Sequence, residues 1–261
     1  MFRLTREVRF AINAPHADAP GTGSNNFAAN PPLVGLGQYF SLAVTLSGEL
    51  DPDSQYLVNI KQIDAAVRER AIGVVAAAVP LLAGPSALIA TLFERMSASC
   101  PTLKVDEVRL ALSPQMFVST RAEEYPMTRL SGKFEFSASH RLHNPALSDD
   151  ENRRCFGKCN NPSGHGHNYE LQVTLVGQPD ENGLLVDVPA FERIVAETVI
   201  DRFDHKNLNA EVSEFRELIP SVENIARVIY RLLQPRFATE QARLAAVTVW
   251  ETPKTWCEYS E

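Results

Sequence analysis

Cysteine is scarce in this 261-residue sequence, which contains only four. A small secreted domain held together by disulfides needs a denser and more regular set of cysteines. Cys100, Cys155, Cys159 and Cys257 do not form such a framework. We therefore expect a reducing, cytoplasmic location and free thiols.

The sequence also lacks any block of basic residues, and its net charge is -7 with a pI of about 5.5. Proteins that bind nucleic acid or anionic membranes usually concentrate Lys and Arg on one surface. Neither is expected as a partner, although a local basic pocket could still hold a phosphate.

No uninterrupted apolar segment of membrane-spanning length is present. The first 16 residues lack the apolar core of a signal peptide. Residues 71–93 are long enough to span a bilayer, but they contain Pro80, Pro85 and two glycines. Because proline and glycine interrupt helices, this segment predicts two buried helices separated by a turn.

What the sequence does contain is an internal repeat. Residues 35–48 align with residues 164–177 at a shift of 129, and seven of the fourteen aligned residues are identical. The flanking segments follow in the same order and are similar in residue type. We interpret this pattern as a tandem duplication with its boundary near residues 121–131, which gives units at 1–125 and 130–261.

Each copy has the pattern of an antiparallel α+β unit, in the order strand, strand, helix, helix, strand. Alternation of apolar and polar residues marks the strands, as in residues 133–140. Asp187, followed by Pro189, and Ser221 mark the starts of the two helices of the second copy. The first copy has no counterpart of residues 201–215, so we expect its helices to be joined more directly.

Three histidines continue apolar strand faces in the second copy. His140 ends one face, and His165 and His167 share a face of the next strand because they are two residues apart. The aligned residues of the first copy are Ala14, Leu36 and Gln38. Packing therefore does not require histidine here. Three converging imidazoles predict a zinc site with an open fourth position, and the alternative is a group of hydrogen-bonded core histidines.

Cys159 lies in a loop six residues before His165, and two roles fit it equally well. A thiolate near zinc would have a lowered pKa and could act as a base or nucleophile. Alternatively, Cys159 is a small buried residue, which is the commonest role of a free cysteine. Pairing with Cys155 at zinc is disfavoured, because it would close the site that the histidines leave open.

Two carboxylates and an Asp-His pair complete the candidate site. Glu251 continues an apolar strand face and needs a donor partner, which a ligand with an amidine-like pair of N–H groups would supply. Glu223 is either a second such acid or a solvated residue in the first turn of a helix. In Asp204 and His205 a carboxylate could orient an imidazole, and the alternative is a turn residue followed by a surface histidine. His16 and His143 continue no apolar face, and we assign them no role.

Residues 133–261 resemble the family of 6-pyruvoyl tetrahydropterin synthase and 6-carboxytetrahydropterin synthase. The resemblance rests on FSASHRL, LSDDENRRCFGKCNNPSGHGHNYELQVTLVG, DHKNLN, ENIA and the ET pair at 251–252, in that order. These motifs cover almost all of the second copy. The first copy resembles the same unit only in the order of its strands and helices, and it lacks these motifs.

The resemblance implies tandem tunnelling-fold (T-fold) units, each an antiparallel four-stranded sheet with two helices on one face, whose sheets join into a barrel. It also implies a lyase that converts 7,8-dihydroneopterin triphosphate to 6-pyruvoyl tetrahydropterin with loss of triphosphate. The spacing of Cys159 and His165 favours that product. The alanine- and arginine-rich composition instead suggests a bacterium, where a 6-carboxytetrahydropterin synthase of queuosine synthesis is more usual.

The resemblance also implies roles for individual residues. The zinc ligands would be His140, His165 and His167. Cys159 would transfer protons, and Asp204 with His205 would complete its relay.

The two glutamates would hold the pterin ring through its amino-amide edge. Val222 stands where the family usually has a hydroxyl residue, so Glu223 has less support than Glu251.

A function of another class also fits, namely a non-catalytic pterin- or purine-binding module with structural zinc. The first copy lacks the predicted ligands, the cysteine and the Asp-His pair, so we expect it to be structural and inactive. In single-unit members of the family the site lies between subunits, so a homo-oligomer is expected.

Overall fold

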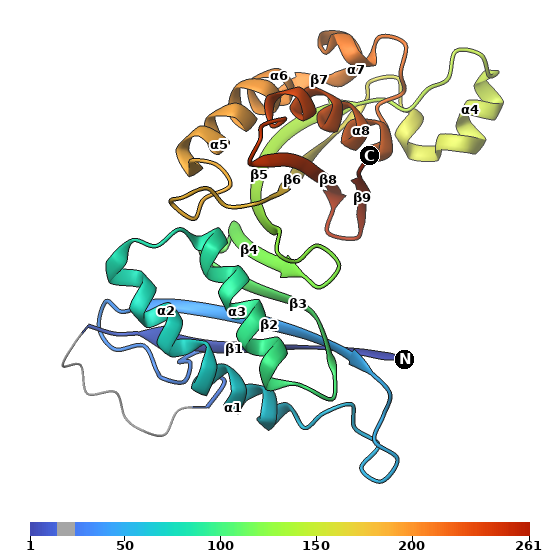
Figure 1. Cartoon of the computed structure of the whole chain (residues 1–261). Coiled ribbons are helices and arrows are strands. Elements are labelled where there is room, and N and C mark those ends of the chain that lie inside the picture. Colours follow the sequence, from blue (N-terminus) through green and yellow to red (C-terminus); the bar gives the residue numbers. More distant parts are fainter. Residues whose placement is uncertain (15–23) are drawn as a thin grey trace. The chain divides into compact units, whose positions relative to one another are not determined.

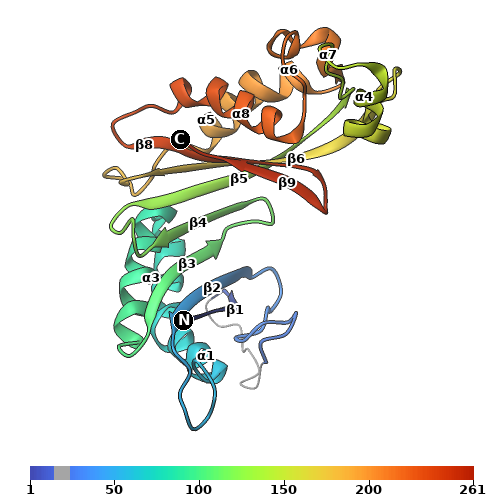
Figure 2. The same ribbon diagram turned by 90° about the vertical axis from the view of Figure 1, so that its right-hand side faces the viewer.

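The computed structural model describes residues 1–14 and 24–261, so His16 lies outside the described residues. The chain forms two compact units (Figure 1). The first contains Met1–Leu130 and Gly177–Leu185, and the second contains Ser131–Val176 and Val186–Glu261. In each unit the helices lie on one face of a sheet (Figure 2).

The sheet of the first unit has four antiparallel strands in the order β1-β2-β3-β4. They are β1 (Phe2–Ile12), β2 (Gln38–Gly48), β3 (Lys104–Ala111) and β4 (Met116–Arg121). Its helices are α1 (Ile60–Arg70), α2 (Ile72–Ala78) and α3 (Pro85–Ser99). Buried residues pair across the strands, with Val8 opposite Leu42 and Val44 opposite Val108. This register keeps one face of the sheet apolar for the helices.

The apolar segment 71–93 forms two helices separated by a turn, as its prolines and glycines predict. Leu82 has a φ of 51°, in the left-handed region, and Pro85 is at the start of α3. Ile89, Leu92 and Met96 of α3 are fully buried. Within residues 1–14 and 24–261, no helix is both long and apolar enough to cross a membrane.

Residues 25–31 cover part of the outer edge of β1. The backbone N–H of Arg9 donates to Asn25 Oδ1 at 2.7 Å, and its carbonyl accepts from the N–H of Asn30 at 3.0 Å. The N–H of Ala11 donates to the Pro31 carbonyl at 2.9 Å. These bonds satisfy backbone groups that an edge strand otherwise leaves open.

The second unit has the strand order β5-β6-β8-β9. The strands are β5 (Thr128–His140), β6 (His165–Gly177), β8 (Ala242–Thr252) and β9 (Thr255–Tyr259). The short β7 (Lys206–Asn207) pairs in parallel with the end of β5, where Lys206 lies opposite Ala138. Both units thus contain the four-stranded sheet of a T-fold. The alternation of apolar and polar residues predicts only three strands per copy. It does not reveal β4 and β9, because each is the short second strand of a hairpin.

Both predicted helix starts of the second unit are confirmed. Asp187 caps α5 (Val188–Val195) by accepting from the N–H of Ala190, and Ser221 caps α8 (Val222–Leu233) by accepting from the N–H of Asn224. The remaining helices of this unit are α4 (Asp149–Phe156), α6 (Asp201–Phe203) and α7 (Leu208–Glu211).

The segment before the second strand was expected to be a loop, but it contains helix α4. Ser148 and Glu151 form a complete capping box at its start. The Ser-x-x-Glu spacing was the available signal.

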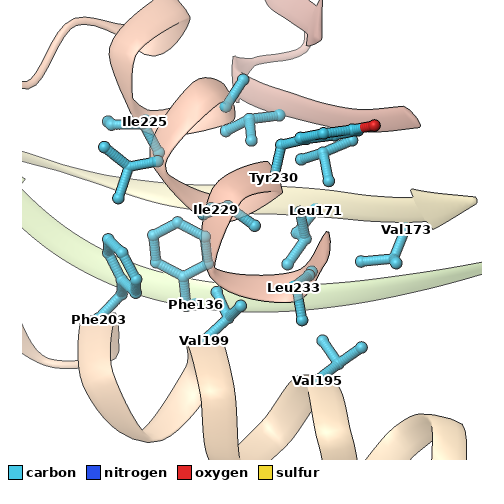
Figure 3. Packing of buried hydrophobic residues seen from close by; sticks show 14 of the residues in the cluster. Phe136, Leu171, Val173, Val195, Val199, Phe203, Ile225, Ile229, Tyr230 and Leu233 are labelled. Carbon is cyan, nitrogen blue, oxygen red and sulfur yellow. The ribbon is translucent and has the colours of Figure 1, made fainter. Parts of the chain in front are cut away.

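The core of the second unit lies between one face of its sheet and helices α5 and α8 (Figure 3). Phe136 of β5 stacks on Tyr169 of β6, with ring centroids 4.9 Å apart. Ile229 of α8 and Leu171 of β6 are fully buried in the same cluster. Residues that follow Phe136 on this face, at every second position, therefore point toward the helices. His140 is one of them.

We predict that Ile229→Ala lowers the free energy of unfolding by about 2–5 kcal/mol, because it leaves a cavity in a close-packed cluster. Urea denaturation checks the value. The exposed Arg243→Ala in β8 is the control and should change it by less than about 0.5 kcal/mol. An equal effect of the two substitutions would contradict this description of the core.

Candidate metal centre and active site

Three histidine side chains meet where β5 ends and β6 begins. His140 is the last residue of β5, and His165 and His167 lie at the start of β6. One nitrogen of each imidazole lies within 4.8 Å of the other two. The Nε2 atoms of His140 and His165 are 3.1 Å apart. This is the one group of three or more metal-ligating side chains among the described residues.

The tautomer of His140 follows from its hydrogen bond. Its Nδ1 lies 2.7 Å from the carbonyl oxygen of Pro220, which can only accept. Nδ1 therefore carries the proton, and the Nε2 lone pair points into the group of histidines. The ring is completely buried, and burial lowers the pKa of His140 to about 4. A neutral imidazole oriented by a backbone carbonyl is a typical metal ligand.

The three histidines fit a divalent metal ion. Nδ1 of His165 and Nε2 of His167 are buried and have no hydrogen-bond partner in the described part of the chain. Burial is also the main cause that lowers the pKa of His167, so a bound proton is disfavoured. Two nitrogens bound tetrahedrally to one zinc at 2.0–2.1 Å lie about 3.3 Å apart, close to the separation of the two Nε2 atoms.

Glu251 of β8 lies beside the histidines, as its position on an apolar face indicates. Its Oε1 is 3.4 Å from Nε2 of His140 and 3.7 Å from Nε2 of His167. The side chain is 17% exposed. A carboxylate placed at the rim of such a centre can accept N–H groups of a bound molecule.

Cys159 lies near Glu251. It belongs to a 3-10 helix, Gly157–Asn160, and its side chain is half-buried. Burial first, and Glu251 second, raise the pKa of the Cys159 thiol. The charge of a nearby cation would act in the opposite direction and favour the thiolate.

Asp204 and His205 form a hydrogen-bonded pair. Nδ1 of His205 lies 2.7 Å from Oδ2 of Asp204, and Oδ1 of Asp204 accepts from the N–H of Ser137 at 2.7 Å. The Ser137 N–H is the main cause that lowers the pKa of Asp204, followed by His205. His205 has a φ of 57°, and its N–H donates to the Ser137 carbonyl at 2.6 Å. This conformation costs energy in a residue other than glycine, so the surroundings hold His205 in place.

The Asp204–His205 pair lies on the other side of the β5–β6 strand pair. His205 lines a cavity of about 490 Å³ together with Ser137, Ser139 and Asn168, and His167 also borders this cavity. Ser137 and Ser139 alternate with Ala138 and His140 along β5, so they point away from the core. Within one chain, the structure therefore brings Glu251 to the histidines and Cys159 near Glu251, and it places His205 beside the residues of β5 that point to the opposite face.

Glu223 lies three residues after Pro220, whose carbonyl bonds to His140. It is exposed in the first turn of α8, and it is the second cause, after burial, that raises the pKa of the Cys257 thiol. The neighbouring Val222 is buried.

Two contacts of His140 were not predicted from the sequence. One is the Pro220 carbonyl, for which no side-chain pattern exists. The other is the hydroxyl of the buried Tyr169, 3.4 Å from Nδ1 of His140, which the alternation of β6 could have suggested.

The first unit has a different arrangement at the aligned positions. The Asn13 amide accepts from the N–H of Val34 at 2.9 Å and donates to the Pro32 carbonyl at 2.9 Å. Leu36 points fully into solvent. A Cβ atom at Gly37 would lie 2.4 Å from Asn13 Oδ1. The side-chain amide of Asn13 therefore occupies the space next to Gly37.

The fold and the site define a T-fold protein with a group of three histidines that could hold a metal ion. The family model for 6-pyruvoyl tetrahydropterin synthase matches residues 129–261. The chain therefore belongs to the 6-pyruvoyl tetrahydropterin synthase family.

Proteins named as 6-pyruvoyl and as 6-carboxy tetrahydropterin synthases both match, over 41–52% of this chain. The 6-pyruvoyl tetrahydrobiopterin synthase of Homo sapiens is 42% identical over 107 residues, which are 41% of this chain and 74% of that protein. The 6-carboxy-5,6,7,8-tetrahydropterin synthase of Haemophilus influenzae is 28% identical over 156 residues, covering 52% of this chain and all of that protein. The solved structure of Caenorhabditis elegans 6-pyruvoyl tetrahydropterin synthase is 36% identical, covers 52% of this chain and 96% of that chain, and has a TM-score of 0.50.

We predict that the protein purifies with about one divalent metal ion per chain, and that His167→Ala loses most of it because one of three ligands is gone. Elemental analysis by mass spectrometry measures the content. His205→Ala, on the opposite face, is the control and should keep its metal. Retention of metal by His167→Ala would rule out this centre.

Proposed function

We propose that the second unit is a zinc-dependent lyase that converts 7,8-dihydroneopterin triphosphate to 6-pyruvoyl tetrahydropterin with loss of triphosphate. The observation that carries the proposal is the group of three histidines, with Glu251 and Cys159 beside it on one face. Membership of the family and the names of the relatives support the same reaction.

His140, His165 and His167 would hold the metal. Zinc suits them because three imidazoles bind it well and leave a fourth position for substrate. When bound, the metal would supply a Lewis acid that polarises oxygens of the substrate side chain. The hydrogen bond from His140 to the Pro220 carbonyl keeps that ligand in the tautomer that binding requires.

Glu251 would bind the pterin ring. The amino-amide edge of a pterin presents two neighbouring N–H donors, which match the two oxygens of a carboxylate. Such binding would place the substrate side chain at the metal. Glu223 is proposed in the same role with weaker support, because it is exposed and Val222 replaces the hydroxyl residue usual in the family.

Cys159 would remove and return protons at the carbons of the substrate side chain. Its half-buried position next to Glu251 allows it to reach a molecule bound there. The Asp204–His205 pair would complete the proton relay. Since this pair lies on the other face of the strands, we propose that a second copy of the chain supplies it in a homo-oligomer.

The first unit cannot supply that pair, because His16 is its only histidine in the sequence. We propose that the first unit, at residues 1–125, arose by tandem duplication and has a structural role. The catalytic unit would occupy residues 130–261. Sheets of several units would join into a barrel, as in the T-fold that the resemblance implies.

A 6-carboxytetrahydropterin synthase acting on the same substrate is the second candidate. The full-length match to the Haemophilus influenzae protein favours it, whereas the spacing of Cys159 and His165 and the higher identity to the human protein favour the 6-pyruvoyl product. Incubation with 7,8-dihydroneopterin triphosphate and mass spectrometry of the product distinguishes them. Release of acetaldehyde would identify the 6-carboxy enzyme.

A non-catalytic pterin- or purine-binding module with structural zinc would explain the histidines and Glu251 equally well. Only turnover separates it from a lyase. The absence of any product from the metal-loaded protein would favour this module.

We predict that Cys159→Ala lowers kcat by about 10²- to 10⁴-fold, the usual range for loss of a proton-transferring group, while the metal content stays unchanged. Steady-state kinetics and elemental analysis measure both. Cys155→Ala is the matched control, since Cys155 is exposed on α4. Unchanged turnover in Cys159→Ala would contradict the proposed mechanism.

A complementation experiment tests whether two copies form the site. Cys159→Ala and His205→Ala should each be nearly inactive when expressed alone. Co-expression of the two variants should restore part of the activity, because some sites combine an intact Cys159 with an intact His205 of another copy. No restoration, together with a monomeric native mass, would show that one chain supplies both groups.

A further inference from the structure

Two segments that carry proposed catalytic groups are bound directly to each other. Arg141 follows the metal ligand His140 at the end of β5, and Asn160 follows Cys159 in the 3-10 helix. The guanidinium of Arg141 donates from Nε to the Asn160 carbonyl at 3.2 Å and from Nη2 to its Oδ1 at 3.1 Å. The planar fork of arginine suits such a two-point contact.

Two more bonds join the same segments. The N–H of Leu142 donates to the Cys159 carbonyl at 2.8 Å. Nδ1 of His143 lies 3.0 Å from Asn160 Oδ1, which can only accept, so the imidazole donates. The side chain of Asn160 is thereby held from two directions, and the residue is only 8% exposed. His143, to which the sequence assigned no role, thus supports Asn160.

Arg141 is itself fixed by the segment that follows the Asp204–His205 pair. Its backbone N–H donates to Oδ1 of Asn209 at 2.7 Å, and its carbonyl accepts from Nδ2 of Asn209 at 3.0 Å. These two bonds hold the backbone of Arg141 independently of the segment that contains Cys159, so its guanidinium can support that segment.

We propose that Asn160, held by Arg141 and His143, is a positioning residue that fixes the Cys159 thiol relative to the metal centre. This inference rests on the proposed lyase function. Gly157, two residues before Cys159, has a φ of 50°. The segment Asn161–Gly164, which begins two residues after Cys159, is neither helix nor strand. The bonds to Asn160 and Cys159 are thus what ties the thiol to the end of β5. A displacement of about 1 Å at a reacting group can cost 10²-fold in rate.

The test uses the full-length, metal-loaded protein with Asn160→Ala, Asn160→Asp and Arg141→Lys. Asn160→Asp keeps an oxygen that accepts from Arg141 and His143, whereas alanine removes it. Arg141→Lys loses the two-point contact. Arg153→Lys on α4 is the matched control, because the Arg153 side chain is exposed and, within residues 1–14 and 24–261, pairs only with Asp150.

Five quantities are measured for each variant: kcat, KM, the metal content, the thermal stability, and the rate at which iodoacetamide alkylates Cys159. Mass spectrometry of the peptide that contains Cys159 separates it from the other three thiols. In Asn160→Ala we expect kcat to fall at least about tenfold with KM within about threefold, as for loss of positioning rather than of binding. The alkylation rate should change by at least about threefold because the thiol has moved.

Asn160→Asp should retain most of the kcat and the alkylation rate of the wild type. Arg141→Lys should resemble Asn160→Ala, and the double variant should be no worse than the more impaired single one, since both act through one contact. Metal content should be unchanged throughout.

The proposal is overturned if iodoacetamide alkylates Cys159 in Asn160→Ala at the wild-type rate. It is also overturned if kcat falls only together with loss of metal or of thermal stability. Equal impairment in Asn160→Asp and Asn160→Ala would also overturn it. If the wild-type protein forms no product from dihydroneopterin triphosphate, the proposed function fails, but the alkylation rates still decide whether Asn160 positions Cys159.

Discussion

The hydrogen bond between His140 and the Pro220 carbonyl is the interaction on which the proposed metal centre depends. It joins the end of β5 to the residue just before the N-cap of α8, so a ligand and a core helix share one contact. It fixes the tautomer, the ring plane and the direction of the free lone pair. A side-chain partner could rotate away, whereas this backbone carbonyl is held by the capped start of α8.

The site is an extension of the hydrophobic core rather than a separate structure. The face that carries Phe136 and Tyr169 continues directly into His140 and His167, and the same packing that buries the aromatic rings orders the imidazoles. Burial removes water from the nitrogens and lowers the pKa values of His140 and His167. The core thus keeps the imidazoles of His140 and His167 neutral, as binding of a cation would require. The energetic cost is that, among the described residues, Nδ1 of His165 and Nε2 of His167 have no hydrogen-bond partner.

The two-residue period of strands was enough to predict which side chains share a face. It placed His140, His165, His167 and Glu251 together, and local capping residues gave the starts of α5 and α8. The Pro220 carbonyl was beyond prediction because backbone groups are alike in every sequence. The position of His205 depends on a left-handed backbone conformation and on pairing of β7 with β5, neither of which its neighbours in the sequence indicate.

The covering of β1 by residues 25–31 has a consequence for how copies of this protein can meet. Backbone groups of Arg9 and Ala11 are already bonded to the chain's own loop. A foreign strand therefore cannot pair along the whole length of β1 without displacing that loop. The covered edge opposes the growth of sheets into fibrils. It also restricts pairing of another strand with β1 to the part of β1 that residues 25–31 leave free, which limits the possible registers.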